Sequence, residues 1–119
     1  MGSYGFQSPI KRTEIAVQAL AQPGMERVHL LVAGQLAESY DLLGWARRLG
    51  VADRVTLLGY VGFGDLEAAI TACDLCVNLR YPSAGETSAS LLRVLALGRP
   101  ALVSDYAQFT DLPPTVAPR

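Results

Sequence analysis

Short apolar runs alternate with amphipathic segments about four times along this chain, and this alternation constrains its fold most. The apolar runs are about 4–8 residues long, which suits strands covered on both faces. The pattern predicts an α/β fold: a Rossmann-like, mainly parallel sheet of about four or five strands with helices on both faces. The expected strands lie at 3–6, 28–33, 55–58, 75–79 and 101–103, and the expected helices at 11–21, 41–49, 65–73 (capped by Asp65) and 91–96.

Size and composition exclude several classes of protein. The chain has 119 residues, enough for one small domain but not for two. Its apolar runs are too short to span a membrane, its opening does not resemble a secretory signal, and its net charge of −1 provides no basic patch for nucleic acid. Cys73, Cys76 and His29 are too few for a four-ligand zinc site, so we expect no metal or other cofactor. Reduced thiols and the lack of a targeting segment favour the cytoplasm.

The segment from Asp74 to Asp105 carries the clearest sign of a ligand site. It combines an expected strand, a polar loop with Gly85, and a helix. The first N–H groups of a helix have no internal partner and favour an anion. Carboxylate and hydroxyl groups crowd the same turn, which suits a ligand with both phosphate and sugar groups: Glu86, Thr87, Ser88 and Ser90.

The other polar loops also follow expected strands, at 5–11, 34–36 and 59–64. In open parallel sheets, ligands bind beyond the carboxyl ends of the strands. The chain has no dinucleotide fingerprint, phosphate-loop motif, His-x-x-x-His pair or nucleophile elbow. His29 lies inside an expected strand, which is more typical of a packed histidine than of a catalytic one.

Several motifs, in order and covering nearly the whole chain, resemble the C-terminal domain of the GT-B glycosyltransferases. The resemblance is closest to the glycosyl transferases group 1 family, family 4. It implies a domain that binds a nucleotide-diphosphate sugar, with the acceptor bound by a separate N-terminal domain that is absent here. The motifs are Gly5 to Lys11, Leu30 to Gly34, Arg54 to Val61, Asp74 to Leu79, Gly85 to Ser88 and Leu97 to Pro100.

The resemblance also implies roles for individual residues. Lys11 matches the basic residue that neutralises the diphosphate, and Gly5 opens the same substrate-binding loop. Tyr60 and Val61 match the loop that contacts the nucleobase. Glu86 matches the acidic residue that meets the donor sugar, so Lys11 and Glu86 are the expected catalytic residues.

Thr87 and Ser88 match the loop that meets the donor sugar and phosphates. Two departures from the family pattern concern charge. The family usually has a second Glu on the following helix to hold the ribose, but that position is Arg93 here. Arg93 would instead form an ion pair or reach a phosphate. The family often adds an arginine before its basic residue; here that charge is missing or is supplied by Arg12.

The resemblance implies that residues 1–119 form the donor-binding domain of a retaining, metal-independent glycosyltransferase, as a piece of a longer two-domain protein. We expect the piece to be inactive alone and prone to self-association. Lys11 and Glu86 should face one shallow pocket, with Ser88 at the start of its helix. Two alternatives stay open: a non-catalytic nucleotide- or phosphate-binding module, and a flavodoxin-like interaction domain.

Plainer roles are open for the charged candidates too. Lys11 is alternatively a solvated lysine, and Glu86 a carboxylate favoured by a helix dipole. Arg93 is alternatively a surface arginine. Arg80 is alternatively a strand-end arginine that pairs with an acid.

Overall fold

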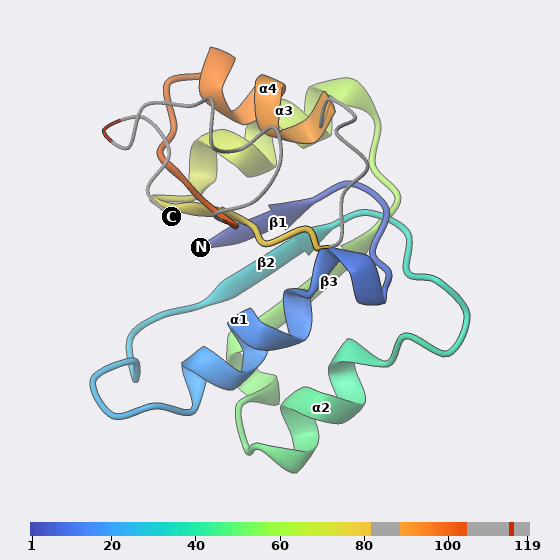
Figure 1. Ribbon diagram of the computed structural model, residues 1–119, viewed down its shortest axis with the longest axis vertical. Helices are drawn as coiled ribbons and strands as arrows, with labels where there is room; N and C mark the ends of the chain where they lie inside the picture. Colours follow the sequence, from blue (N-terminus) through green and yellow to red (C-terminus); the bar gives the residue numbers. More distant parts are fainter. Residues whose placement is uncertain (82–88, 105–114, 116–119) are drawn as a thin grey trace.

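The sheet at the centre of the molecule has five parallel strands in the order β3-β2-β1-β4-β5 (Figure 1). The structure is a computed structural model that describes residues 1–81, 89–104 and 115. The predicted Rossmann-like parallel sheet is confirmed. Its strands are β1 (Gly2–Tyr4), β2 (Leu30–Ala33), β3 (Val55–Gly59), β4 (Cys76–Asn78) and β5 (Ala101–Val103).

Helices cover both faces of this sheet, as the sequence predicted. In Figure 1, α1 (Thr13–Leu20) and α2 (Leu42–Arg48) lie on one side, and α3 (Phe63–Ala72) and α4 (Ala89–Ala96) on the other. Two short 3-10 helices, η1 (Pro9–Lys11) and η2 (Ala52–Arg54), precede α1 and β3. None of the helices in the described part of the chain is long and apolar enough to cross a bilayer.

The position of β2 between two layers of helices explains why its sequence is almost continuously apolar. Leu30 and Val32 belong to the core beside α1 and α2, whereas Leu31 and Ala33 contact the core beside α3 and α4. Successive side chains of a strand point to opposite faces. A strand between two helical layers therefore needs apolar residues at every position.

The helix expected at 11–21 is present as α1, but it begins two residues later because the chain turns at Arg12. Arg12 has φ 58°, in the left-handed region, and its N–H donates to the Pro9 carbonyl at 3.2 Å. This bond closes η1, and α1 begins at Thr13. The Lys11 side chain donates to the Tyr4 carbonyl, which holds η1 against the end of β1. A tertiary contact has thus replaced the first turn of the expected helix.

Other helix and strand ends differ from the predicted ones for local reasons. Gly5 has φ +91° and ends β1 before the predicted Phe6. The predicted cap at Asp65 is wrong, since Gly62 precedes α3 and Asp65 lies within its first turn. An acidic residue there still favours the helix dipole. Asp41 does cap α2, because its carboxylate accepts from the Gly44 N–H at 2.9 Å.

The loops after β1 and β2 pack very closely at the carboxyl edge of the sheet. A Cβ atom added to Gly34 would lie 1.8 Å from the carbonyl oxygen of Gly5. The Gly5 N–H also donates to the Ala33 carbonyl at 3.0 Å. Only a glycine at position 34 lets the two loops run side by side.

Candidate functional site

Two adjoining pockets open at the carboxyl edge of the sheet, and Gly5 and Phe6 line both of them. The aromatic pocket, of about 320 Å³, is lined by Gly5, Phe6, Ala33, Gly34, Gln35, Tyr60, Val61, Phe63 and Leu66. The basic pocket, of about 280 Å³, is lined by Gly5, Phe6, Ser8, Ile10, Lys11, Arg80, Ala89 and Ser90.

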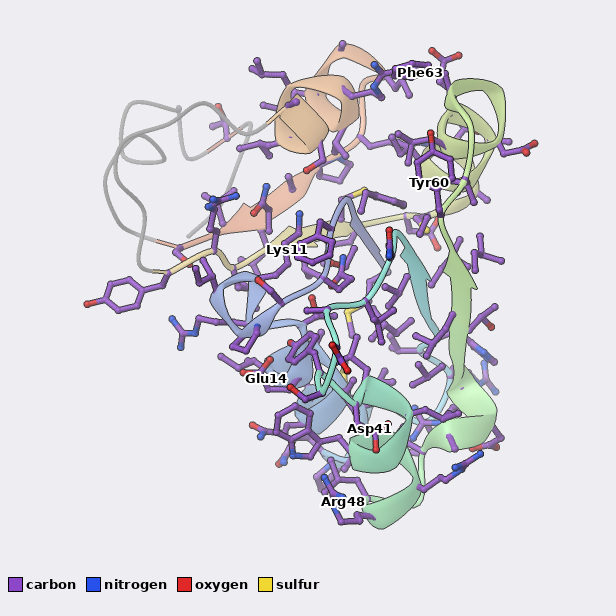
Figure 2. The ribbon with its side chains drawn as sticks, turned by 90° about the vertical axis from the view of Figure 1, so that its right-hand side faces the viewer. Lys11, Glu14, Asp41, Arg48, Tyr60 and Phe63 are labelled. Carbon is purple, nitrogen blue, oxygen red and sulfur yellow. The ribbon has the colours of Figure 1, made fainter. Side chains whose placement is uncertain are left out.

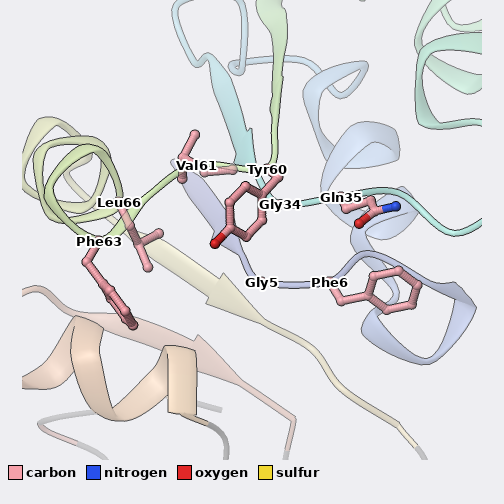
Figure 3. A pocket seen from close by; sticks show the side chains of 9 residues that line it. Gly5, Phe6, Gly34, Gln35, Tyr60, Val61, Phe63 and Leu66 are labelled. Atoms are coloured by element: carbon pink, nitrogen blue, oxygen red, sulfur yellow. The ribbon is translucent and has the colours of Figure 1, made fainter.

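Three aromatic side chains of the aromatic pocket are largely exposed. Tyr60 is 83% exposed, Phe63 74% and Phe6 60%. In the view of Figure 3, the Tyr60 ring lies between those of Phe63 and Phe6. Aromatic rings in this setting offer flat apolar faces on which a planar ligand can stack.

Two of these rings, Tyr60 and Phe63, come from the loop between β3 and α3 and from the start of α3. Gly59 ends β3 with φ +69°, which turns the chain away from the sheet. Tyr60 then projects outward, while Val61 and Leu66 pack against the core beside α3. Phe63 begins α3, and its ring points away from Tyr60 toward Arg93 of α4 (Figure 3). The loop is therefore anchored by its apolar residues and exposes its aromatic ones.

Lys11 is the central residue of the basic pocket. Its side chain is buried, with 8% of the residue exposed. The Nζ atom donates to the Tyr4 carbonyl and to Ser90 Oγ, the latter at 3.3 Å. Lys11 thus links η1 to the end of β1 and to the first turn of α4. Figure 2 shows it in the same half of the molecule as Tyr60 and Phe63.

The surroundings of Lys11 disfavour its charged form. Burial, and secondarily the nearby Arg80 guanidinium, lower the pKa of Lys11 from 10.5 to about 8. Within the described part of the chain, both hydrogen-bond partners of Lys11 are neutral. A bound anion would stabilise the charged form and raise this pKa again.

Helix α4 adds to the positive character of the basic pocket. Ala89 and Ser90, in its first turn, line the pocket beside Lys11 and Arg80. The N-terminal end of a helix carries partial positive charge. No carboxylate occurs among the described residues that line this pocket. Its chemistry therefore favours an anion.

Gly5 leaves room next to Lys11. A Cβ atom at this position would lie 3.4 Å from Lys11 Nζ and 3.5 Å from Ser90 Oγ. Its φ of +91° is also one that side-chain-bearing residues rarely adopt. Gly5 therefore shapes the backbone and keeps the space between the two polar groups open.

The structure brings together four of the residues predicted from sequence. Gly5 and Lys11 line the basic pocket, and Tyr60 and Val61 line the aromatic pocket. The loop residues Glu86, Thr87 and Ser88 lie outside the described residues, as do the expected pairing of Lys11 with Glu86 and the place of Ser88 at its helix start.

The two arginines that the sequence offered lie elsewhere. Arg93 Nη1 is 3.8 Å from Glu67 Oε1, and its guanidinium lies 4.5 Å from the centre of the Phe63 ring. The ion pair foreseen as one alternative for Arg93 is thus present. The Arg12 guanidinium lies 5.6 Å from the centre of the Tyr81 ring. Neither arginine lines the two pockets.

Sequence reasoning missed Phe6, Gln35 and Phe63 in the aromatic pocket. Each follows closely behind a strand, at the edge where ligands of parallel sheets bind. An aromatic residue directly after a glycine in such a loop was a usable signal for Phe6.

The cysteines belong to the core and not to either pocket. Cys73 and Cys76 are buried and free. Burial raises the pKa of the Cys76 thiol, whose Sγ donates to the Tyr4 hydroxyl at 3.6 Å. Within the described residues, no three His, Cys, Asp or Glu side chains could hold a metal ion.

Comparisons with known proteins agree on the fold. The family model for "Glycosyl transferases group 1" matches residues 1–114. HepE from Anabaena, crystallised in complex with UDP, superposes with a TM-score of 0.76 at 24% identity over 92% of this chain. Sucrose-phosphate synthase from Thermosynechococcus elongatus gives a TM-score of 0.80 at 23% identity over 98% of this chain.

The chain spans 31% of the length of each of these two proteins. The catalytic domain of a cholesterol-α-glucosyltransferase from Helicobacter pylori is also similar, with a TM-score of 0.76 at 17% identity. That match covers 97% of this chain and 74% of the other. No curated protein sequence matches the chain.

Proposed function

Because this chain belongs to the glycosyl transferases group 1 family, we propose that it binds the nucleotide diphosphate of a sugar donor across its two pockets. The observation that carries this proposal is the contact between a neutral aromatic pocket and a basic one through Gly5 and Phe6. A ligand that fits both must be flat and apolar at one end and anionic at the other.

The nucleobase would occupy the aromatic pocket. Stacking on the exposed Tyr60 ring would cover apolar surface of both partners. Gln35, also at this pocket, carries amide donor and acceptor groups that can meet the polar edge of a base.

The diphosphate would occupy the basic pocket, with Lys11 as its main counter-charge. The Lys11 ammonium and the first turn of α4 would stabilise the negative charge that grows on the diphosphate as the sugar leaves. This chemistry needs no metal and no base from this chain. It fits a retaining transfer in which Glu86 contacts the donor sugar.

Transfer would also need a second domain that holds the acceptor. Alignment of two reactants supplies a large part of an enzyme's rate. We therefore propose that this chain binds the donor without the second domain, but that it transfers no sugar without it.

Titration calorimetry with UDP, UMP and uridine tests the proposed site in the 119-residue chain. We expect affinity to rise from uridine to UMP to UDP, because each phosphate adds contacts in the basic pocket. ADP and GDP, tested in parallel, would show which base the aromatic pocket prefers. A chain that binds none of these ligands would be an interaction domain instead.

Lys11→Met is the matching variant. It keeps a long apolar side chain but removes the charge, so UDP affinity should fall roughly 100-fold while uridine affinity stays unchanged. Arg48→Met is the control, since Arg48 lies on α2 and lines neither pocket (Figure 2). Equal loss of UDP and uridine affinity in Lys11→Met would contradict a phosphate role for this lysine.

A further inference from the structure

We infer that Arg80 is the second cation of the basic pocket and that it binds the same diphosphate as Lys11. The inference rests on the proposed function and assigns a residue to its anionic subsite. Arg80 lies two residues after the end of β4, and Lys11 belongs to η1. Two segments far apart in the sequence thus supply two positive charges to one pocket.

Two cations that line one pocket attract an anionic ligand. Arg80 is half-buried and Lys11 is buried, so water screens their charges less than at an open surface. The Arg80 charge also helps to lower the pKa of Lys11. A ligand with at least two negative charges can contact both cations, and a diphosphate carries them.

The remaining lining of the pocket suits the same ligand. The hydroxyls of Ser8 and Ser90 can each donate to a phosphate oxygen. The missing side chain of Gly5 leaves space beside Lys11 Nζ. A guanidinium can also grip a phosphate with two parallel N–H donors, which a lysine cannot do.

Position favours Arg80 over the other candidate arginines. Arg12, which the sequence offered as the second charge, lies against the Tyr81 ring. Arg93 is engaged with Glu67 and Phe63 on the α3 side. Of these three arginines, Arg80 is the one that lines the basic pocket.

Calorimetry with Arg80→Gln tests the assignment. We expect UDP affinity to fall by about tenfold or more, since a charge-assisted contact is lost, while uridine affinity stays unchanged. Arg80→Lys should recover part of the UDP affinity because it restores the charge without the two-pronged geometry. Arg12→Asn is the control: it removes a charge outside the pocket with a residue that tolerates positive φ. It should bind UDP like the original chain.

A second measurement tests whether the Arg80 charge lies close to Lys11 in the basic pocket. The pKa of Lys11, followed by NMR of its side chain, should rise in Arg80→Gln because a neighbouring positive charge is gone. If Arg80→Gln does not fold, Arg80→Lys carries the test, with a selective loss of UDP affinity expected.

Three results would overturn the assignment. UDP binding unchanged in both Arg80 variants would remove Arg80 from the subsite and leave the proposed function standing. Equal losses of UDP and uridine affinity would show that Arg80 supports the fold instead. A chain with intact Arg80 that binds no UDP would overturn the proposed function together with this inference.

Discussion

The aromatic and basic pockets share two residues but offer a ligand opposite kinds of contact. The aromatic pocket presents exposed, neutral rings, foremost Tyr60. The basic pocket instead holds a buried ammonium group at Lys11. Contacts of the first kind depend on the apolar area covered, whereas contacts of the second depend on charge. Changes in pH and salt, and substitutions of side chains that line only one pocket, should therefore act on one pocket at a time.

The two pockets also differ in their effect on folding. Tyr60 protrudes from a loop, so the fold does not depend on its ring. Burial of the charged Lys11 opposes folding, by about 3 kcal/mol at neutral pH for a pKa lowered to about 8. The basic pocket thus contains a group that lowers stability, as expected if it serves the proposed binding of an anion.

The largest expected effect comes from Gly34→Ala, which should damage both pockets at once. The new Cβ would lie 1.8 Å from the Gly5 carbonyl oxygen and 2.5 Å from its carbon, so the backbone must move. We expect a loss of about 4 kcal/mol or more in the free energy of unfolding, measured by denaturant titration, and weak binding of UDP and uridine alike.

Gly64→Ala is the matched control for this change. Gly64 lies in α3, and an added Cβ would meet nothing within 4 Å. Alanine is the better helix former, so stability should stay equal or increase by about 0.5–1 kcal/mol. Gly34→Ala with the same stability as Gly64→Ala would show that the loops can separate freely.

Lys11→Met should change how stability depends on pH. With Lys11, the folded chain loses a proton near pH 8 and the unfolded chain near 10.5, so between these values the unfolded state binds more protons. The free energy of unfolding of the original chain should therefore rise, relative to Lys11→Met, by up to about 3 kcal/mol from pH 7 to pH 10.

Comparison with the variant removes the contributions of other groups. Burial raises the pKa of the Tyr4 hydroxyl and of the Cys76 thiol, and each lowers stability as the pH rises through its unfolded pKa. These effects are common to both chains and cancel in the difference. A difference that is flat across this range would mean that Lys11 is not desolvated.

Tyr60→Ala should affect the aromatic pocket alone. Loss of one stacking ring should weaken uridine and UDP by the same factor, on the order of tenfold, in calorimetry. Tyr60→Phe keeps the ring and should bind as before. Leu58→Ala controls for lost apolar area, because Leu58 is exposed on β3 and lines neither pocket. A loss restricted to UDP would place the base elsewhere.

Salt should give the smallest effect. Raising NaCl from about 50 mM to about 500 mM should lower UDP affinity severalfold, because it screens the charges of the basic pocket. Uridine affinity should hardly change, and Lys11→Met should show a weaker dependence for UDP. Equal salt dependence for uridine and UDP would contradict the division between the two pockets.

The arrangement of a sheet between two layers of helices was predictable, because it depends on the local pattern of apolar and polar residues. A continuous apolar run such as the one in β2 can be satisfied only between two helical layers. Parallel strands then force the following loops, with Gly5, Lys11 and Tyr60, to one edge. That the candidate ligand residues share this edge therefore follows from sequence and topology.

Only the tertiary structure decided how those residues meet. Arg12 adopts a left-handed conformation, and Lys11 turns inward to the Tyr4 carbonyl and Ser90, because contacts with β1 and α4 outweigh helical continuity at η1. The same contacts bring Lys11 into one pocket with Arg80, while Arg93 turns to Glu67. These conformations depend on contacts with side chains distant in sequence. Periodicity and local propensity carry no information about such contacts.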